Sequence, residues 1–182
     1  MDTQHILRIR WDIPFTRTSW HVDRGRTFQQ YRWSLFTRFT LPCLQRQRVP
    51  WRVWLWADRE LTALHAELPL DDSRVRFVYD LNEEARSVSE AGPDQTFMIG
   101  RIDSDDMLAP EALELVEQAA LQVDATRPYL QMFGGCAYDE ARNRVLPWRH
   151  PSPAFVFRPM MGTDLARGFP SFGGKHSRVY QE

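Results

Sequence analysis

Three carboxylates, Asp103, Asp105 and Asp106, fall within four consecutive positions of this chain. Adjacent negative charges repel one another, so such a cluster indicates that a positive group belongs among them. Carboxylate oxygens are the ligands that hard divalent cations prefer. The spacing therefore predicts a site for a divalent cation.

A short apolar run, Phe97 to Ile102, leads into these acids and predicts a buried strand. In an open α/β sheet, ligands bind beyond the carboxyl ends of the strands, which is where the acids would lie. The competing interpretation is a helix amino terminus dressed with acids, because a helix is expected to start near Ala109. One acid would satisfy that helix end, and the chain supplies three.

Two other kinds of Asp-x-Asp site do not fit. A calcium loop of the EF-hand type requires Asp or Asn at position 107 and Gly at 108, where this chain has Met107 and Leu108. A phosphatase that forms an aspartyl phosphate carries its motif after the first strand, followed by Thr or Val. The late position and Met107 argue against that class.

Strands and helices alternate along the first two thirds of the sequence, and strand-rich sequence follows. This order predicts one α/β domain whose mainly parallel sheet is flanked by helices and gains antiparallel strands late in the chain. Residues 14–32 are expected to form a long loop, and 159–182 show no periodicity. The predicted strands are 5–10, 51–56, 75–79, 97–102, 129–138, 143–148 and 154–157; the predicted helices are 33–47, 58–68, 82–91 and 110–123.

Charge is unevenly distributed over the 182 residues. The balance of basic over acidic side chains is +6 for residues 1–60, −12 for 61–140 and +5 for 141–182. An acidic centre between basic ends suits a metal site that receives an anionic ligand, although part of the acidity is expected to be solvated helix surface.

Composition indicates a cytoplasmic location. No window approaches the ~20 apolar residues of a membrane span, and the first residues lack the pattern of a signal peptide. Cys43 and Cys136 have no metal-type spacing, so we expect both to be reduced and packed as small core residues, with a disulfide between them as the alternative.

The run Arg101-Ile-Asp-Ser-Asp-Asp-Met-Leu108 resembles the R-[LI]-D-S-D-D-x-[LI] motif of rhamnosyltransferase-like proteins among the GT-A-type glycosyltransferases. Weaker similarity extends to residues 36–58 and to Ser152–Phe157. The resemblance implies a single GT-A-like (Rossmann-like) domain over 1–182. Residues 1–108 would form its nucleotide-sugar-binding half and 109–182 its acceptor half.

The resemblance also implies a metal-dependent sugar transfer from a nucleoside-diphosphate sugar. Asp105 would bind the cation, and Asp103 would contact the ribose or a metal-bound water. Asp106 would support the site, and Arg101 would pair with the acids or face a phosphate. Opposite charge stabilises the leaving nucleoside diphosphate without a proton, which is the physical role of the cation.

Four further residues complete the predicted site. His176 falls where such enzymes carry a carboxy-terminal histidine and is a further candidate metal ligand. Arg10 and Asp80 end predicted strands at the same edge and are candidates for contact with the donor, with strand-end capping as the alternative. Asp164 is the candidate general base that would deprotonate the acceptor hydroxyl.

The acceptor is left open and could be a glycan, a small molecule or DNA, since the family's chains continue further beyond the acidic motif. Two other function classes remain. A nucleic-acid-binding or DNA-base-modifying protein would use the basic, aromatic first third of the chain. A non-catalytic GT-A-like domain would serve as a partner module. The residues that favour nucleic-acid binding are Trp11, Trp20, Arg24, Arg26, Tyr31, Arg32 and Trp33.

Overall fold

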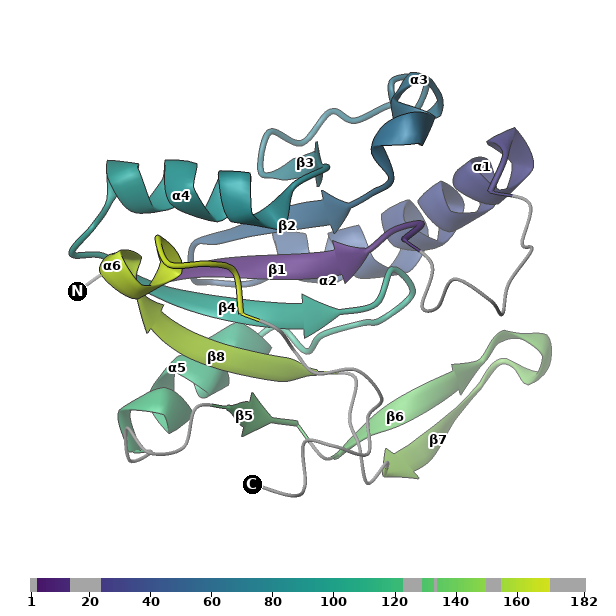
Figure 1. The fold of residues 1–182 in the computed structure, drawn as a ribbon. Coiled ribbons are helices and arrows are strands. Elements are labelled where there is room, and N and C mark those ends of the chain that lie inside the picture. The colour runs from purple at the N-terminus through teal and green to yellow at the C-terminus, as the bar shows by residue number, and fades with distance from the viewer. Residues whose placement is uncertain (1–2, 14–23, 123–128, 133, 150–154, 171–182) are drawn as a thin grey trace.

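A six-stranded sheet organises the molecule, in the order β3-β2-β1-β4-β8-β5 (Figure 1). The structure is a computed structural model and describes residues 3–13, 24–122, 129–132, 134–149 and 155–170. β1 to β4 are parallel, whereas β8 runs antiparallel to both β4 and β5. The predicted α/β class with a mainly parallel sheet is confirmed. The strands are β1 Gln4–Arg10, β2 Trp51–Trp56, β3 Val75–Val78, β4 Thr96–Ile102, β5 Leu130–Gln131 and β8 Val156–Met161.

The strand order reverses between β1 and β4. From β1 the chain adds β2 and then β3 on one side, and it returns to place β4 on the other side of β1. The carboxyl ends of β1 and β4 therefore lie side by side where the strand order reverses, which is the place where open α/β sheets bind their ligands. In Figure 1 this edge lies at the right, where the arrows of β1, β2 and β4 end.

Side-chain alternation divides the core between the two faces of the sheet. Leu7 and Ile9 pack with residues of α1, α2 and α5 on one face, called here the α5 face. Ile6 and Trp54 pack with α4 and α6 on the other, called the α4 face. The period of two in β1 thus buries both of its faces. The helices are α1 Arg26–Leu35, α2 Leu41–Gln45, α3 Thr62–His65, α4 Leu81–Ala91, α5 Ala112–Gln122 and α6 Gly162–Leu165.

The first helix begins earlier than predicted. α1 starts at Arg26, inside the segment 14–32 that was expected to be a loop. It continues through a π-helical turn, Phe36–Thr40, into α2. Pro42 lacks an N–H and would clash with the carbonyl four residues earlier in a regular helix. The wider turn, in which the Leu41 N–H bonds the Phe36 carbonyl, relieves that clash and keeps the helix continuous.

The last strand is longer than predicted and a short helix follows it, so the expectation of no regular structure from residue 159 onward is wrong for 159–165. Pro159 was the misleading signal. β5 pairs with β8 only at Val156 and Phe157, so at Pro159 the strand has one neighbour and a missing N–H costs no bond to β5.

A separate two-stranded sheet pairs β6 (Gly134–Asp139) with β7 (Arg144–Arg149), which correspond to the second part of the predicted strand 129–138 and to the predicted strand 143–148. A short helical turn, Glu140–Arg142, joins its strands, and Asn143 follows with a φ of 46°. The hairpin extends to the right in Figure 1, toward the side where the parallel strands end.

Smaller features of the structure complete the comparison with the sequence. Asp58 caps the helical segment after β2, at the start of the predicted helix 58–68, since its side chain accepts the Glu60 N–H. Both cysteines are free; Cys43 is half-buried, whereas Cys136 is exposed, so the prediction that Cys136 packs in the core is wrong. Among the described residues, no helix is both long and apolar enough to cross a membrane.

Candidate functional site

The three acids form a turn directly after β4, and each has a different environment. The Asp103 N–H donates to Oδ2 of Asp106 at 2.7 Å, and the Asp106 N–H donates back to the Asp103 carbonyl at 3.3 Å. Asp106 thus closes the turn. Ser104 is buried, while Asp103 is half-buried and Asp105 is exposed. Asp105 is the acid best placed to reach a ligand.

Burial raises the pKa of Asp106 to about 6, and the negative charges of Asp103 and Asp105 act in the same direction. The bond from the Asp103 N–H and the charge of Arg101 oppose the rise. A second positive charge in the turn would reduce this repulsion. The binding of a cation in this turn stays a prediction.

Arg32 in α1 ties this turn to the end of β1. Its Nη2 donates to Oγ of Ser104 at 2.7 Å and to the Arg10 carbonyl at 3.0 Å, and its Nη1 donates to the Trp11 carbonyl. Burial lowers the pKa of Arg32, against the charges of Asp103, Asp105 and Asp12. One guanidinium therefore joins the end of β1 to the turn that follows β4.

Asp12 anchors the backbone that follows β1. Its side chain is fully buried and accepts from His65 Nε2 at 2.8 Å, Gln29 Nε2 at 2.9 Å and the Asp58 N–H at 2.7 Å. These partners come from α3, α1 and the end of β2. Asp12 therefore has a structural role: it holds the end of β1 against α1, α3 and the end of β2.

Three arginines gather on the α4 face, just below the same edge. Arg8 and Arg101 are paired positions of β1 and β4, and Arg10 lies two residues beyond Arg8. The Trp56 ring receives two of them, with its centroid 5.3 Å from Cζ of Arg8 and 5.8 Å from Cζ of Arg10. We call these four residues the arginine cluster. The negative charge of Asp103 acts to raise the pKa of Arg8 and of Arg10, so the cluster adjoins the acidic turn.

Five of the residues predicted from the sequence lie together at the switch point between β1 and β4. They are Arg10, Arg101, Asp103, Asp105 and Asp106. His176 lies outside the described residues, and its assignment as a metal ligand stays a prediction.

Asp80 lies at the same edge but on the outer strand. It follows β3 and caps α4, where its Oδ1 accepts the N–H groups of Asn82 at 2.9 Å and Glu83 at 3.1 Å. The bonds from Glu83 and Asn82 lower the pKa of Asp80. Its observed contacts are those of a helix cap, the alternative that the sequence left open.

Asp164 lies at the opposite edge of the sheet. It belongs to α6, whose first residues bond the chain just before β4: the Gly162 N–H donates to the Gln95 carbonyl and the Thr163 N–H to the Pro93 carbonyl. The length of β4 therefore separates Asp164 from the acidic turn, because α6 follows an antiparallel strand. The structure does not bring the predicted general base to the site.

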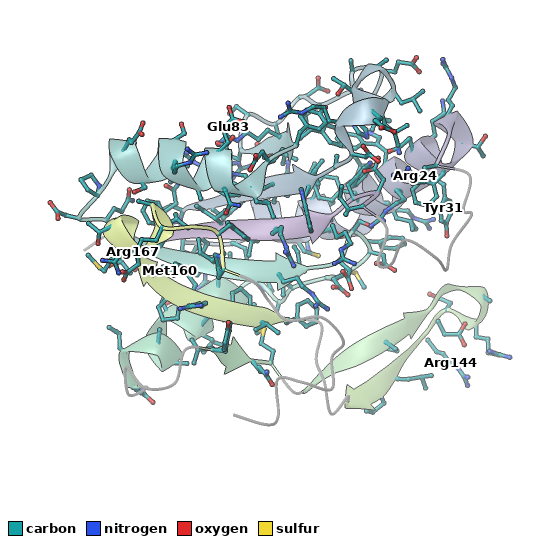
Figure 2. All side chains as sticks on the ribbon, in the orientation of Figure 1. Arg24, Tyr31, Glu83, Arg144, Met160 and Arg167 are labelled. Atoms are coloured by element: carbon teal, nitrogen blue, oxygen red, sulfur yellow. The ribbon has the colours of Figure 1, made fainter. Side chains whose placement is uncertain are left out.

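The residues that favoured nucleic-acid binding divide between the interior and the surface of the protein. Trp11 is fully buried, Trp33 is 8% exposed and Arg32 bonds the site as described. Arg24 pairs with Asp58 at 2.6 Å, and Arg26 pairs with Glu67. Tyr31 is 61% exposed (labelled with Arg24 in Figure 2), and Trp20 lies outside the described residues.

Sequence reasoning missed Arg8, Asp12 and Trp56, and it named Arg32 only as a candidate for nucleic-acid binding. The alternation of β1 was visible and places Arg8 and Arg10 on one face, so Arg8 could have been found from Arg10. Asp12 could have been noted as an acid after a strand. The contact of Arg32 with the acidic turn gave no signal, because it depends on α1 crossing to the edge of the sheet.

The side chains at this edge could hold a divalent cation only if a bound anionic molecule supplied the remaining coordinating oxygen atoms. Within the described ranges, no three His, Cys, Asp or Glu side chains are arranged to hold a metal. Mg²⁺ sites commonly use one or two carboxylates together with phosphate oxygens and water. Asp105 and Asp103 match that kind of partial donor set.

Two hollows, of about 420 and 410 Å³, lie elsewhere, between α1 and residues 68–73. They share Trp33, Thr37 and Pro69 in their walls, and the acidic turn borders neither. The charged edge, and not these hollows, is therefore the candidate site.

No protein-family model matches this chain, and no curated protein matches its sequence.

Proposed function

We propose that this protein is a metal-dependent glycosyltransferase with a GT-A-like fold. It moves a sugar from a nucleoside-diphosphate sugar to a hydroxyl acceptor. One observation carries the proposal: the acidic turn with its Asp-x-Asp sequence stands at the carboxyl edge of a parallel sheet, beside the switch point between β1 and β4. That is the position where open α/β sheets bind nucleotides.

The residues at this edge suit departure of a nucleoside diphosphate. Asp105, exposed, and Asp103, half-buried, would hold Mn²⁺ or Mg²⁺ against the two phosphates. The bound cation would supply positive charge where the leaving diphosphate becomes more negative. Arg10 and Arg101 add positive charge on the same side and are suited to contact phosphate oxygens.

Asp106 and Arg32 position the turn. Asp106 fixes its backbone through the Asp103 N–H, and Arg32 fixes it against β1 through Ser104. Both therefore orient Asp105, and neither needs to touch the donor to matter. Asp164 has no part in this proposal, and the acceptor is a hydroxyl whose activating base is not assigned.

Donor turnover tests the proposal. The purified protein is incubated with a panel of nucleoside-diphosphate sugars in Mn²⁺ or in EDTA, and released nucleoside diphosphate is measured. We expect release only with metal and a loss of at least a hundredfold in Asp105→Ala. The control is Asp94→Ala, an exposed acid at the other end of β4. Metal-independent release would reject the metal-dependent mechanism. No release with any donor, while the fold is intact, would reject the transferase proposal and favour a non-catalytic module.

A further inference from the structure

A hollow of about 380 Å³ lies at the amino ends of β1, β2 and β3, at the edge of the sheet opposite the acidic turn. In Figure 1 this edge is at the left, where β1 and β2 begin. We call it the amino-edge hollow. The residues of its wall that bear on ligand binding are Gln4, Trp51, Arg52, Ser73, Arg74 and Arg76.

Three arginines from two neighbouring strands meet at this hollow. Arg52 and Arg74 each lie one residue before the first paired valines of β2 and β3, and Arg76 follows on β3. Partial burial and then the positive charge of Arg52 lower the pKa of Arg76. Like charges on neighbouring strands repel, so the arrangement is unfavourable unless negative charge is supplied.

The fold supplies carboxylates for two of the three arginines. Asp72 accepts from Arg74 Nε at 2.9 Å and from its Nη2 at 2.7 Å, and Glu84 pairs with Arg76. Arg52 is exposed, and among the described residues it has neither an ion pair nor a hydrogen bond. One guanidinium at the hollow is therefore left without a counter-charge from this part of the chain.

Protection of the sheet edge explains only part of this charge. β3 is an edge strand, and charged side chains on an edge strand discourage pairing with other chains. That role accounts for Arg74 and Arg76. Arg52 belongs to β2, which pairs with β1 on one side and β3 on the other, so Arg52 has no edge to protect.

Neutral donors border the same hollow. The side chains of Gln4 and Ser73 have no hydrogen-bond partner within the described ranges. Trp51 is 3% exposed, and its buried Nε1 likewise finds no acceptor there. The wall thus combines an unpaired guanidinium with neutral polar groups, which suits an anionic group attached to a polar body.

We propose that the amino-edge hollow binds the phosphate group of a small molecule, with Arg52 as the principal contact. A guanidinium binds phosphate oxygens through parallel hydrogen bonds, and the dianion would offset the repulsion between Arg52 and Arg76. A hollow of about 380 Å³ has the size of a small-molecule pocket, which favours a phosphorylated metabolite over a nucleic-acid strand. The inference is independent of the proposed sugar transfer, because the two sites lie at opposite edges of the sheet.

Calorimetric titration in EDTA, at constant ionic strength, tests the site with inorganic phosphate and glucose 6-phosphate as probes. We expect both to bind wild type, and Arg52→Met to bind them at least tenfold more weakly. Arg52→Lys, which keeps the charge but not the planar fork, should bind at least threefold more weakly. Because Arg52 is exposed, Arg52→Met should melt within about 2 °C of wild type. The matched control is Arg59→Met, an exposed arginine beyond the other end of β2, which should bind like wild type.

Two supporting outcomes separate the sources of the phosphate group. Equal affinity for the two probes would show that a free phosphate ion is sufficient, whereas tighter binding of glucose 6-phosphate would identify a phosphate ester as the ligand.

The inference is overturned if neither probe binds wild type, or if Arg52→Met binds both unchanged. It is also overturned if Asp105→Ala abolishes binding and Arg52→Met does not, because the phosphate would then lie at the acidic turn. A single-stranded oligonucleotide that depends on Arg52 and binds more tightly than both probes would assign the hollow to nucleic acid and overturn it equally.

Discussion

Arg32 donates two hydrogen bonds to the Ser104 hydroxyl, from Nη2 at 2.7 Å and from Nε at 3.2 Å, across 72 residues of sequence. This contact joins α1 to the acidic turn, and the same guanidinium bonds the carbonyls that follow β1. The edge of the sheet that carries the acidic turn therefore depends on a helix whose position could not be predicted from the sequence.

Removing that guanidinium is expected to loosen the turn. Arg32→Met should lower the free energy of unfolding by about 2–3 kcal/mol, because it deletes charged hydrogen bonds and leaves buried acceptors unsatisfied. Ser104→Ala should cost about 1 kcal/mol. Chemical denaturation measures both. Arg46→Met, an exposed position after α2, is the matched control and should change little. Equal stability of Arg32→Met and Arg46→Met would show that Arg32 does not hold the edge.

Asp12 is expected to be among the residues least tolerant of substitution. Asp12→Ala would leave the buried His65 and Gln29 side chains and the Asp58 N–H without their acceptor. The expected loss in the free energy of unfolding is about 3–5 kcal/mol, measured by denaturant titration. Asp71→Ala, at an exposed acid, should lie within about 0.5 kcal/mol of wild type. A similarly small effect at Asp12 would contradict the network described.

Gly100 has no room for a side chain. A Cβ there would lie 2.7 Å from Cε1 of Phe157 and 2.8 Å from Cδ2 of Leu7, which are its register partners on β8 and β1. Gly100→Ala should therefore lower the melting temperature, with a cost of about 1–3 kcal/mol from overpacking. Gly135→Ala is the control, since its Cβ would meet nothing within 4 Å. Equal melting temperatures for the two variants would refute the packing account of β4.

Acid should destabilise the protein through His5. Its ring is fully buried, with Nε2 2.9 Å from Oε1 of Glu117; burial lowers its pKa below the ordinary 6.5, although Glu117 acts in the opposite direction. Because the neutral form is favoured in the fold, its stabilising contribution is complete above pH 6.5. It is lost as the pH falls from there through the lower pKa of the folded protein.

The matched variant for this pH dependence is His5→Gln, which keeps a donor for Glu117 but does not titrate. The free energy of unfolding, measured by denaturant titration from pH 8 to pH 5, should fall less steeply in His5→Gln than in wild type. Parallel curves for the two proteins would place the pH dependence in other groups.

The strand–helix order and the acidic turn were predictable from sequence, because both are local patterns. Phe97 to Ile102 is apolar and continuous, and three acids follow it directly. The switch point was not predictable, since it depends on which side of β1 the fourth strand pairs. α1 was missed because its polar surface masks the apolar spacing, and β8 was cut short at Pro159 because the sequence does not show that β5 has already ended there.

The site shows the same division between local and long-range information. Asp103, Asp105 and Asp106 were found because they are neighbours in sequence. The pairing of Arg8 with Arg101 and the bond from Arg32 to Ser104 connect residues that are far apart in the chain. Asp164 was assigned to the site as a candidate general base without any information on its position, and an antiparallel last strand carries it to the opposite edge.

Calorimetric binding of nucleoside diphosphates tests the central claim most directly. Each diphosphate is titrated into wild type and Asp105→Ala with Mn²⁺, and again in EDTA. We expect one nucleoside diphosphate to bind wild type at least tenfold more tightly with Mn²⁺ than in EDTA, and the gain to vanish in Asp105→Ala while metal-free binding remains. Binding that is unchanged by Mn²⁺, or a metal-dependent gain that persists in Asp105→Ala, would contradict the assignment of the acidic turn as a diphosphate–metal site.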